Sequence, residues 1–254
     1  LVAADAQGAW VLTTAAVFHM TADGRRTATL ELAQQPLPAV DGLIADGRGG
    51  VWMLAGREGP LHWDGRRLER PALPEGLRDS LVTAALVDRR GRTWFAFANG
   101  RLARTDGAGW TLERLVLPPG RIARVFAEGA DGRLWLGGEG VLASVDGERA
   151  DVLVSSERFP ITAITAIVPD NRGSLWLGAS NGVVHMSEAV FLEAARSGAG
   201  RARFVVYTRS DGVAGTPVAV AANKGAVRTG DGRMWFVTTR GITVLDPHVL
   251  EAHS

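Results

Sequence analysis

The chain has no cysteine, only one tyrosine, and no unbroken apolar run of the length, about 18 residues, that a membrane-spanning helix needs. Without cysteine, disulfides, thiolate catalysis and zinc–thiolate sites are excluded. The chain also has no large excess of positive or negative charge, since it contains 28 Lys and Arg and 27 Asp and Glu residues. A dedicated nucleic-acid-binding protein usually has a clear basic excess, so that class is not expected.

The composition that remains suits a globular protein with many turns. Of the 254 residues, 46% are hydrophobic and 22% are charged, and there are 32 glycines and 11 prolines. The first residues, Leu1 to Asp5, contain neither Met nor a signal peptide. We therefore expect the chain to begin inside a longer protein.

Tryptophan is the informative residue, because six of the eight tryptophans recur at nearly regular intervals along the sequence. Successive members are 42, 42, 41, 41 and 59 residues apart: Trp10, Trp52, Trp94, Trp135, Trp176 and Trp235. A glycine lies three residues before the tryptophan in every copy but the first, and an aspartate lies six residues before it in three copies: Asp46, Asp88 and Asp170. A fixed period of this length indicates a repeat architecture.

The third copy shows what one repeat encodes. Short apolar runs bounded by Gly, Asp and Asn predict four strands joined by tight turns: Leu81–Val87, Thr93–Ala98, Leu102–Thr105 and Trp110–Leu115. Four antiparallel strands in about 40 residues are typical of a propeller blade. One such sheet cannot bury both faces alone, so we expect the tryptophans to fill the interfaces between blades.

The sequence therefore predicts an all-β propeller with four-stranded antiparallel blades, as a single domain over residues 1–254. The six blades are expected at approximately 1–40, 41–82, 83–123, 124–163, 164–215 and 216–254. A helical solenoid is the main rival, but Gly, Pro or Asp-Gly interrupts nearly every window of ten residues. One helix-like stretch, Ser187–Arg196, belongs to an insertion before Trp235.

Several segments of the sequence resemble the two-component regulator propeller repeat. They include Asp131-Gly132-Arg133-Leu134-Trp135-Leu136-Gly137 and Asp170-Asn171-Arg172-Gly173-Ser174-Leu175-Trp176-Leu177-Gly178. The closing-blade signature of that family is matched by 207–213, 231–236 and 241–247. The resemblance implies an extracytoplasmic, periplasmic sensor module of a bacterial histidine kinase or hybrid two-component system.

The resemblance also implies partners. Other domains of the parent receptor would follow the propeller, and the kinase would lie outside this chain. Propellers of this family usually have seven blades, so the six repeats are either a closed ring or a portion of a seven-bladed one. We expect no catalysis, no cofactor, no metal, no nucleic-acid partner and no membrane contact by this segment. A lyase similar to virginiamycin B lyase and a protein-interaction scaffold are the alternatives.

Three histidines share one position, nine or ten residues after the motif tryptophan: His19, His62 and His185. Each belongs to a different blade, and zinc ligands must converge to about 2.1 Å from one ion. We therefore interpret them as a repeated structural position, and His248 and His253 as solvated tail residues. The turn aspartates are interpreted as caps of β-turns, because a folding device recurs in every blade and an active site does not.

Candidate ligand contacts lie in the loops at one end of the blades. Turns between the second and third strands carry polar residues four or five positions after the tryptophan: Arg57, Asn99, Glu139, Asn181 and Arg240. Connections between blades add Arg78, Arg121 and Arg158 at the same end. These side chains would ring one mouth of a central channel and favour a small polar ligand, such as a carbohydrate or an anion. The alternative is a set of solvated turns.

Overall fold

Short strands separated by tight turns build two units in the computed structural model, which describes residues 1–34, 36–157, 159–170, 172–197, 203–219 and 225–251. The units are Leu1–Val116 and Leu117–Ser254. Each is described by itself. The expectation of a single domain over 1–254, with the blade limits given above, stays a prediction.

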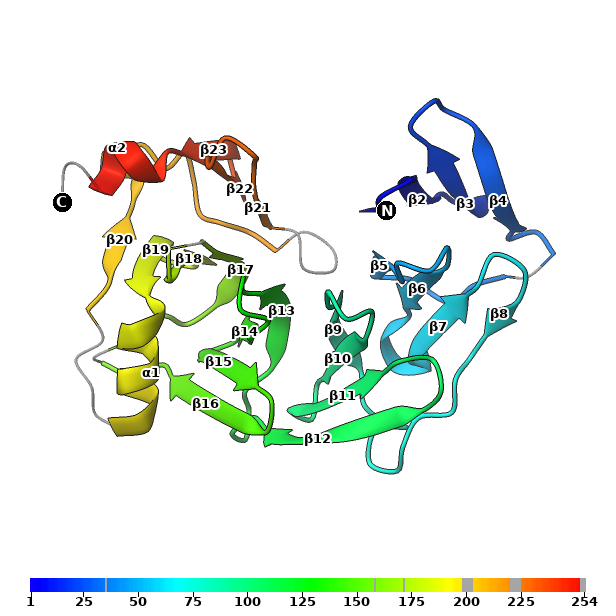
Figure 1. The fold of residues 1–254 in the computed structure, drawn as a ribbon, viewed down its shortest axis with the longest axis horizontal. Helices are drawn as coiled ribbons and strands as arrows, with labels where there is room; N and C mark the ends of the chain where they lie inside the picture. The colour runs from blue at the N-terminus through cyan, green and yellow to red at the C-terminus, as the bar shows by residue number, and fades with distance from the viewer. Residues whose placement is uncertain (35, 158, 171, 198–202, 220–224, 252–254) are drawn as a thin grey trace. The chain divides into compact units, whose positions relative to one another are not determined.

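The first unit contains three four-stranded antiparallel sheets, and in each the strands lie side by side in chain order (Figure 1). The first sheet holds β1 (Val2–Ala4), β2 (Gly8–Leu12), β3 (Ala16–Thr21) and β4 (Arg26–Glu31). The second holds β5 (Gly42–Ala45), β6 (Val51–Leu54), β7 (Pro60–Trp63) and β8 (Leu68–Glu69), with the short 3-10 turn η1 (Gly56–Glu58) between β6 and β7. The third holds β9 (Val82–Val87), β10 (Thr93–Phe97), β11 (Arg101–Thr105) and β12 (Trp110–Val116).

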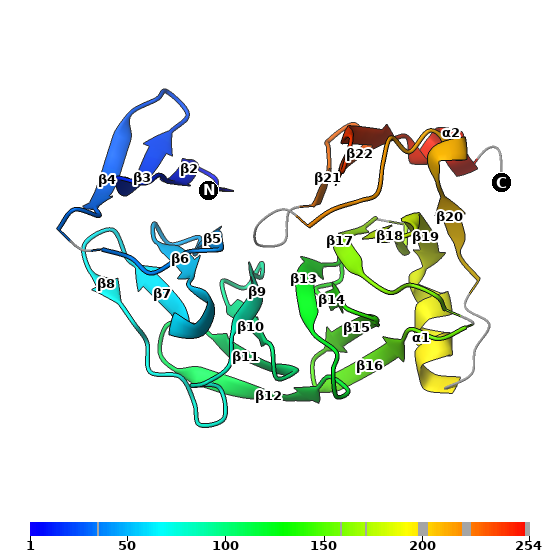
Figure 2. The same ribbon diagram turned by 180° about the vertical axis from the view of Figure 1, so that it is seen from behind.

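The second unit repeats this plan (Figure 2). One sheet holds β13 (Ala123–Glu128), β14 (Leu134–Gly138), β15 (Val141–Asp146) and β16 (Arg149–Val154). The next holds β17 (Ile164–Pro169), β18 (Ser174–Ala179), β19 (Gly182–Ser187) and β20 (Val205–Tyr207). The last holds β21 (Ala226–Arg228), β22 (Met234–Thr238) and β23 (Gly241–Leu245). A 3-10 turn η2 (Arg209–Asp211) and two helices, α1 (Glu188–Ser197) and α2 (Pro247–Glu251), complete it.

The all-β propeller class with antiparallel four-stranded blades is confirmed for five of the six sheets. Strand limits predicted for the third copy agree with β9–β12 to within one residue. The sixth sheet has three strands in the described residues. After β23 the chain turns into α2, because Pro247 fits the first turn of a helix and cannot donate to a strand ladder. The Asp246 carboxylate accepts the His248 amide at 3.0 Å and so starts that helix.

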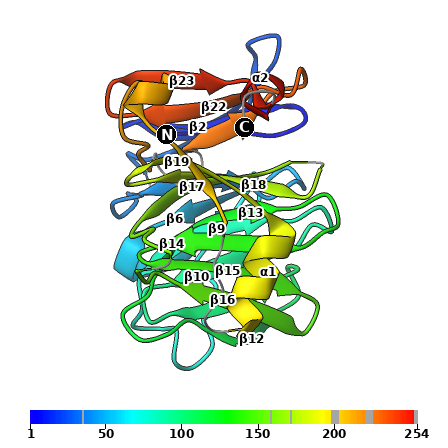
Figure 3. The same cartoon turned by 90° about the vertical axis from the view of Figure 1, so that its left-hand side faces the viewer.

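The predicted helix in the insertion is α1, displaced by one residue. Its buried residues are Phe191 and Ala194, and the Phe191 ring lies edge-on to Trp135 at 5.0 Å between ring centroids. Figure 3 shows α1 lying along the outer strand β16, where the Arg196 guanidinium pairs with Asp151 at 3.0 Å. The insertion therefore covers the outer edge of the sheet that precedes it.

The turns before five of the six motif tryptophans contain a left-handed glycine. The backbone φ is 73° at Gly91 and 78° at Gly173, a region that side-chain-bearing residues rarely occupy. This requirement explains why glycine recurs three residues before the tryptophan. The turn then brings the first and second strands of the sheet into antiparallel pairing, as for β9 and β10.

Within each unit the motif tryptophan of one sheet lies in ring contact or in one hydrophobic cluster with the apolar residue that follows the next tryptophan. The Trp52 ring lies 5.1 Å from the Phe95 ring. The other three pairs share one hydrophobic cluster each: Trp10 with Met53, Trp135 with Leu177, and Trp176 with Phe236. The predicted role of the tryptophans between blades is confirmed for these four.

The last tryptophan does not follow the rule. Trp235 is 37% exposed, whereas Trp10, Trp135 and Trp176 are at most 1% exposed. It belongs to the last sheet of its unit, and no later sheet of the described residues covers it. The expectation that all six tryptophans are buried between blades was therefore wrong at Trp235.

Candidate functional site

Strand order gives each sheet two chemically different ends. The turn between the first and second strands (the a–b turn) lies at one end with the c–d turn. The b–c turn lies at the other end, together with the connection that leads to the next blade. The sequence predicted ligand contacts at the b–c end and structural capping at the a–b end.

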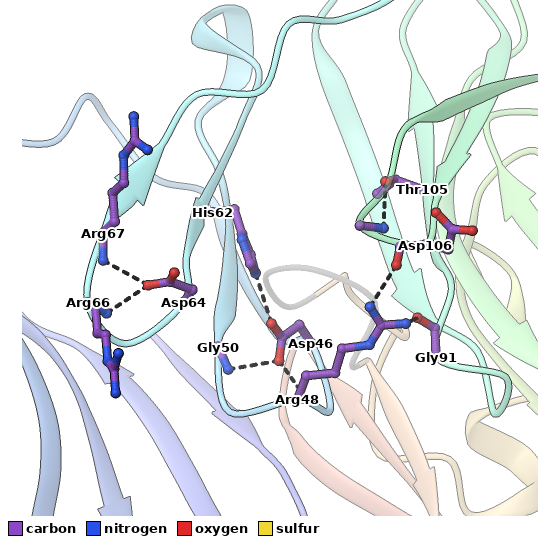
Figure 4. Close-up of polar contacts among 11 residues, drawn as sticks. Asp46, Arg48, Gly50, His62, Asp64, Arg66, Arg67, Gly91, Thr105 and Asp106 are labelled. Atoms are coloured by element: carbon purple, nitrogen blue, oxygen red, sulfur yellow. Dashed lines mark hydrogen bonds and ion pairs between the residues drawn. The ribbon is translucent and has the colours of Figure 1, made fainter.

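The a–b turn of the second sheet is built around Asp46 (Figure 4). One carboxylate oxygen accepts the backbone amides of Arg48 and Gly50 at 2.7 and 2.8 Å. The other oxygen lies 2.8 Å from the His62 Nε2 atom. Burial by itself raises the pKa of the Asp46 carboxyl, but the hydrogen bonds from His62 and the two amides outweigh it, so this pKa lies below its ordinary value.

The same turn in the third sheet uses Asp88 in the same way. It accepts the amides of Arg90 and Arg92 at 3.0 and 2.9 Å, and its second oxygen accepts the Trp94 indole N–H at 2.8 Å. Burial raises the pKa of Asp88, and the hydrogen bonds from Trp94 and Arg92 lower it further than burial raises it. Asp170 likewise accepts two amides, at 2.8 Å each. The interpretation of these aspartates as turn caps is confirmed.

The three histidines occupy one structural position, as predicted. Each is the direct cross-strand partner of its motif tryptophan: Trp10 with His19, Trp52 with His62, and Trp176 with His185. The His185 ring stacks on Trp176 at 4.3 Å with an interplanar angle of 16°. Among the residues that the structure describes, no group of three or more His, Cys, Asp or Glu side chains is placed to hold a metal ion.

Two Asp–His contacts were not predicted from the sequence. His19 Nε2 lies 3.0 Å from Asp5, and His62 Nε2 lies 2.8 Å from Asp46. The sequence contained a signal for these contacts. Both copies have an aspartate five or six residues before the tryptophan and a histidine nine or ten residues after it. The tail histidines were interpreted as solvated: His248 is exposed but lies 3.3 Å from the Arg172 guanidinium, and His253 lies outside the described residues.

Arg48 was also missed by the sequence reasoning. Its guanidinium donates to the carbonyl oxygens of Asp106, at 2.6 Å, and Gly91, at 3.2 Å, which belong to the next sheet (Figure 4). At the a–b end of these two sheets, Asp46 and Arg48 therefore hold the turns through hydrogen bonds within the protein. Nothing in the repeat pattern marks Arg48, because the contact depends on how two neighbouring blades approach each other.

The b–c end of the first unit contains three predicted ligand contacts. The Asn99 amide donates to the Gly76 carbonyl at 2.8 Å, which ties the b–c turn to the preceding connection. The Arg78 guanidinium donates to the Leu73 carbonyl at 3.3 Å. Arg57 is exposed in η1, next to Glu58, which pairs with Arg70. Asn99 and Arg78 therefore hold their own loops, and Arg57 is the side chain that faces solvent.

The b–c end of the second unit contains four of the predicted contacts. The Glu139 carboxylate accepts the Arg124 guanidinium at 2.8 Å. Arg121 lies against Gly140, where an added Cβ would fall 2.1 Å from the Arg121 Nη1 atom and would displace this guanidinium. Asn181 and Arg240 are exposed in the next two b–c turns. Arg158, also predicted, lies outside the described residues.

Backbone hydrogen bonds connect these turns into a row. The Gly140 amide donates to the Thr162 carbonyl at 2.6 Å, and the Ser180 amide donates to the Ala163 carbonyl at 3.0 Å. The hydroxyls of Thr162 and Ser180 lie 2.7 Å apart. We call Arg121, Glu139, Thr162, Ser180 and Asn181 the polar row of the second unit. It offers a cation, an ion pair, two hydroxyls and an amide to one ligand or partner.

Comparison with known proteins gives a fold but no family. No protein-family profile matches the chain. No curated protein matches it either.

No helix of the described residues is both long and apolar enough to cross a membrane.

Solved structures share the fold at low sequence identity. Virginiamycin B lyase from Staphylococcus aureus, in a catalytically inactive form with quinupristin, has a TM-score of 0.68 at 16% identity, covering 96% of this chain and 82% of that chain. YCF48 from Cyanidioschyzon merolae has a TM-score of 0.62 at 12% identity, covering 96% and 80%. The extracellular domain of a putative hybrid two-component system from B. thetaiotaomicron has a TM-score of 0.50 at 15% identity, covering 99% and 39%. The chain therefore has a propeller fold similar to those of a lyase and of a two-component sensor domain.

Proposed function

We propose that this chain is a non-catalytic ligand-sensing propeller, the extracytoplasmic part of a two-component sensor whose kinase lies outside the chain. The observation that carries the proposal is the contrast between the two ends of the sheets. At the a–b end the carboxylates of Asp46, Asp88 and Asp170 are engaged by their own turns. At the b–c end Glu139 is paired with Arg124 and the Thr162 and Ser180 hydroxyls bond each other, but Asn181 is exposed and Arg121 is half-buried beside them, so these two side chains can reach a ligand.

The chemistry of the polar row favours a small polar ligand that carries hydroxyl or carboxylate groups. Arg121 supplies five N–H donors in a planar fork, which matches a carboxylate or two adjacent sugar hydroxyls. The hydroxyls of Thr162 and Ser180 can donate or accept, and the Asn181 amide can do both. A carbohydrate or an organic acid fits this set of groups, and a periplasmic location follows if the sensor assignment holds.

Two further points support the assignment. The closing segment 207–213, with its Asp-Gly after a tyrosine, forms β20 and the capped turn η2, in which Asp211 accepts the Thr208 amide at 2.8 Å. The fold is also one that the extracellular domain of a putative two-component system adopts. Binding by this end would be passed to the other domains of the receptor, which are the expected partners.

The test is a ligand screen against the purified chain with oligosaccharides, organic acids and short peptides, read by thermal shift and confirmed by calorimetry. For a ligand found in this way, Arg121→Ala should weaken binding by about tenfold to a hundredfold, the loss expected for one charged hydrogen bond. Asn181→Ala should weaken it less. The control is Arg149→Ala, an exposed arginine of β16 at the c–d turn, which should leave affinity unchanged.

Binding that survives both Arg121→Ala and Asn181→Ala would contradict a site at the polar row. The lyase alternative is tested separately by metal analysis of the purified protein and by incubation with a streptogramin B antibiotic. Stoichiometric divalent metal together with loss of the antibiotic would support a lyase and contradict the non-catalytic proposal. A gene that continues into a membrane span and a kinase would favour a sensor over an interaction scaffold.

A further inference from the structure

The a–b turn of the β13–β16 sheet has a glycine where other sheets have their capping aspartate. Gly129 takes the position six residues before Trp135. The equivalent residues of the other sheets are Asp46, Asp88 and Asp170. The backbone φ of Gly129 lies outside the left-handed region, so the conformation of the turn does not require a glycine there. This sheet therefore lacks a carboxylate that its backbone could carry.

Two sheets of the first unit show which groups that carboxylate serves. In the β9–β12 sheet one oxygen of Asp88 accepts the Trp94 indole N–H at 2.8 Å and the Arg92 Nε–H at 2.7 Å. In the β5–β8 sheet one oxygen of Asp46 lies 2.8 Å from Nε2 of His62, the cross-strand partner of the motif tryptophan. Three positions therefore point to the carboxylate: the tryptophan, the residue two before it, and its cross-strand partner.

The β13–β16 sheet retains a donor at each of the three positions. They are the Trp135 indole, the Arg133 guanidinium and the hydroxyl of Ser144, which is the cross-strand partner of Trp135. The side chains of Trp135 and Ser144 are fully buried. Trp135 Nε1, Arg133 Nε and Ser144 Oγ are all buried, and none of them has a hydrogen-bond partner among the described residues. Buried donors of this kind cost free energy unless an acceptor reaches them.

The neighbouring groups define where an acceptor would lie. A Cβ on Gly129 would be 3.4 Å from Trp135 Nε1, so the indole lies beside the position of the missing side chain. The same Cβ would be 2.9 Å from Oδ1 of Asp131, which accepts the Arg133 amide at 3.0 Å. Oδ2 of Asp131 is 3.6 Å from Arg133 Nε, too far for a hydrogen bond. The Asp131 side chain is 56% exposed and can turn towards solvent, while Asp146 pairs with the Arg133 guanidinium at 3.0 Å.

We propose that this turn binds a small carboxylate, of which formate is the smallest, through Trp135 Nε1, Arg133 Nε and the Ser144 hydroxyl. The ion takes the place of the carboxylate group that Asp88 supplies in the β9–β12 sheet. Hydrogen bonds to a charged acceptor are stronger than neutral ones, and burial among protein groups strengthens them further. The negative charge of Asp131 opposes the ion and limits its affinity.

The test compares thermal unfolding in sodium formate and in sodium chloride of the same ionic strength. Formate at a few times its Kd should raise the Tm of the wild-type chain by about 2–4 °C relative to chloride. Gly129→Asp should raise the Tm without formate and remove most of the formate response, because its own carboxylate then serves the three donors. Arg149→Ala, at the c–d turn of the same sheet, is the control and should respond like the wild type.

Two further variants test the comparison between sheets. Asp88→Gly leaves the Trp94 and Arg92 donors of the β9–β12 sheet without their acceptor, so it should lower the Tm and enlarge the formate response. Asp131→Asn keeps an acceptor oxygen for the Arg133 amide and removes the opposing charge, so it should also enlarge the response. Asp131→Asn alone supplies this comparison if Asp88→Gly does not fold.

Four results would overturn the proposal. The first two are a wild-type Tm that is the same in formate and in chloride, and a Gly129→Asp variant that keeps the full formate response. The third is an Asp131→Asn variant whose response is smaller than that of the wild type. The fourth is a response that disappears in Arg121→Ala, which would place formate at the polar row. The other three results leave the polar row untouched, so the two sites fail independently.

Discussion

The β5–β8 sheet and the β21–β23 sheet are formed by the same sequence repeat, but the motif tryptophan is buried in the first and partly exposed in the second. Trp52 is 6% exposed, with the Phe95 ring at 5.1 Å on one side and the His62 ring at 4.3 Å on the other. Trp235 is 37% exposed and lies opposite Val244. The repeat therefore specifies the strands and the turns, whereas burial of the tryptophan depends on whether another sheet follows.

The largest difference between the two sheets should appear when the tryptophans are truncated. Trp52→Ala should lower the free energy of unfolding by about 3–5 kcal/mol, because it leaves a large cavity between two sheets. Trp235→Ala should cost less than about 1 kcal/mol, since much of its ring already faces water. Urea unfolding of the two variants checks this, and equal losses would mean that Trp235 is as buried in solution as Trp52.

A smaller difference is expected at the turn aspartates. Asp46→Ala should destabilise the protein by about 2 kcal/mol, because two backbone amides and the His62 ring lose their acceptor. Asp46→Asn keeps an acceptor oxygen for the amides and should cost less. Asp231, whose side chain is 49% exposed, caps the equivalent turn in the last sheet, and Asp231→Ala should cause no measurable change in urea unfolding. A larger loss at Asp231 than at Asp46 would reverse the comparison.

The smallest effect expected is a dependence of stability on acid pH. The pKa of Asp46 is lower in the folded chain than in the unfolded one, so its contribution is fully present above the unfolded pKa of about 4 and is lost as the pH falls through the folded pKa. The unfolding free energy of Asp46→Asn should therefore fall less steeply than that of the wild type between about pH 5 and pH 2. An identical slope for both proteins would show that the Asp46 carboxylate contributes no such dependence.

Local features were predictable because they depend on a few adjacent residues. The third-copy strands and the insertion helix agree with the sequence expectations to within one residue, since turn glycines and apolar runs define their ends. The turn-capping role of Asp88 and Asp170 was predictable for the same reason, as each binds amides two and four residues ahead.

Features that involve contacts between distant residues were not predictable. Asn99 was a candidate ligand contact, but its amide is used by the Gly76 carbonyl, 23 residues earlier in the chain. Arg48 was passed over, although it reaches carbonyl oxygens of the next sheet. The repeat pattern did not predict that β23 would be the outer strand of its sheet in the described residues. The Asp246-Pro247 pair can either end a strand or begin a helix.

The amino-acid sequence by itself determined the class of fold, the number of repeats, the turn chemistry and the position of each tryptophan within its strand. These follow from a period of about 42 residues and from the backbone preferences of glycine, aspartate and proline. The tertiary structure alone decided which polar side chains are already engaged and which tryptophan is left uncovered. Both depend on what packs against a given sheet. The local sequence pattern is nearly the same in every copy of the repeat, so it cannot specify what its neighbours are.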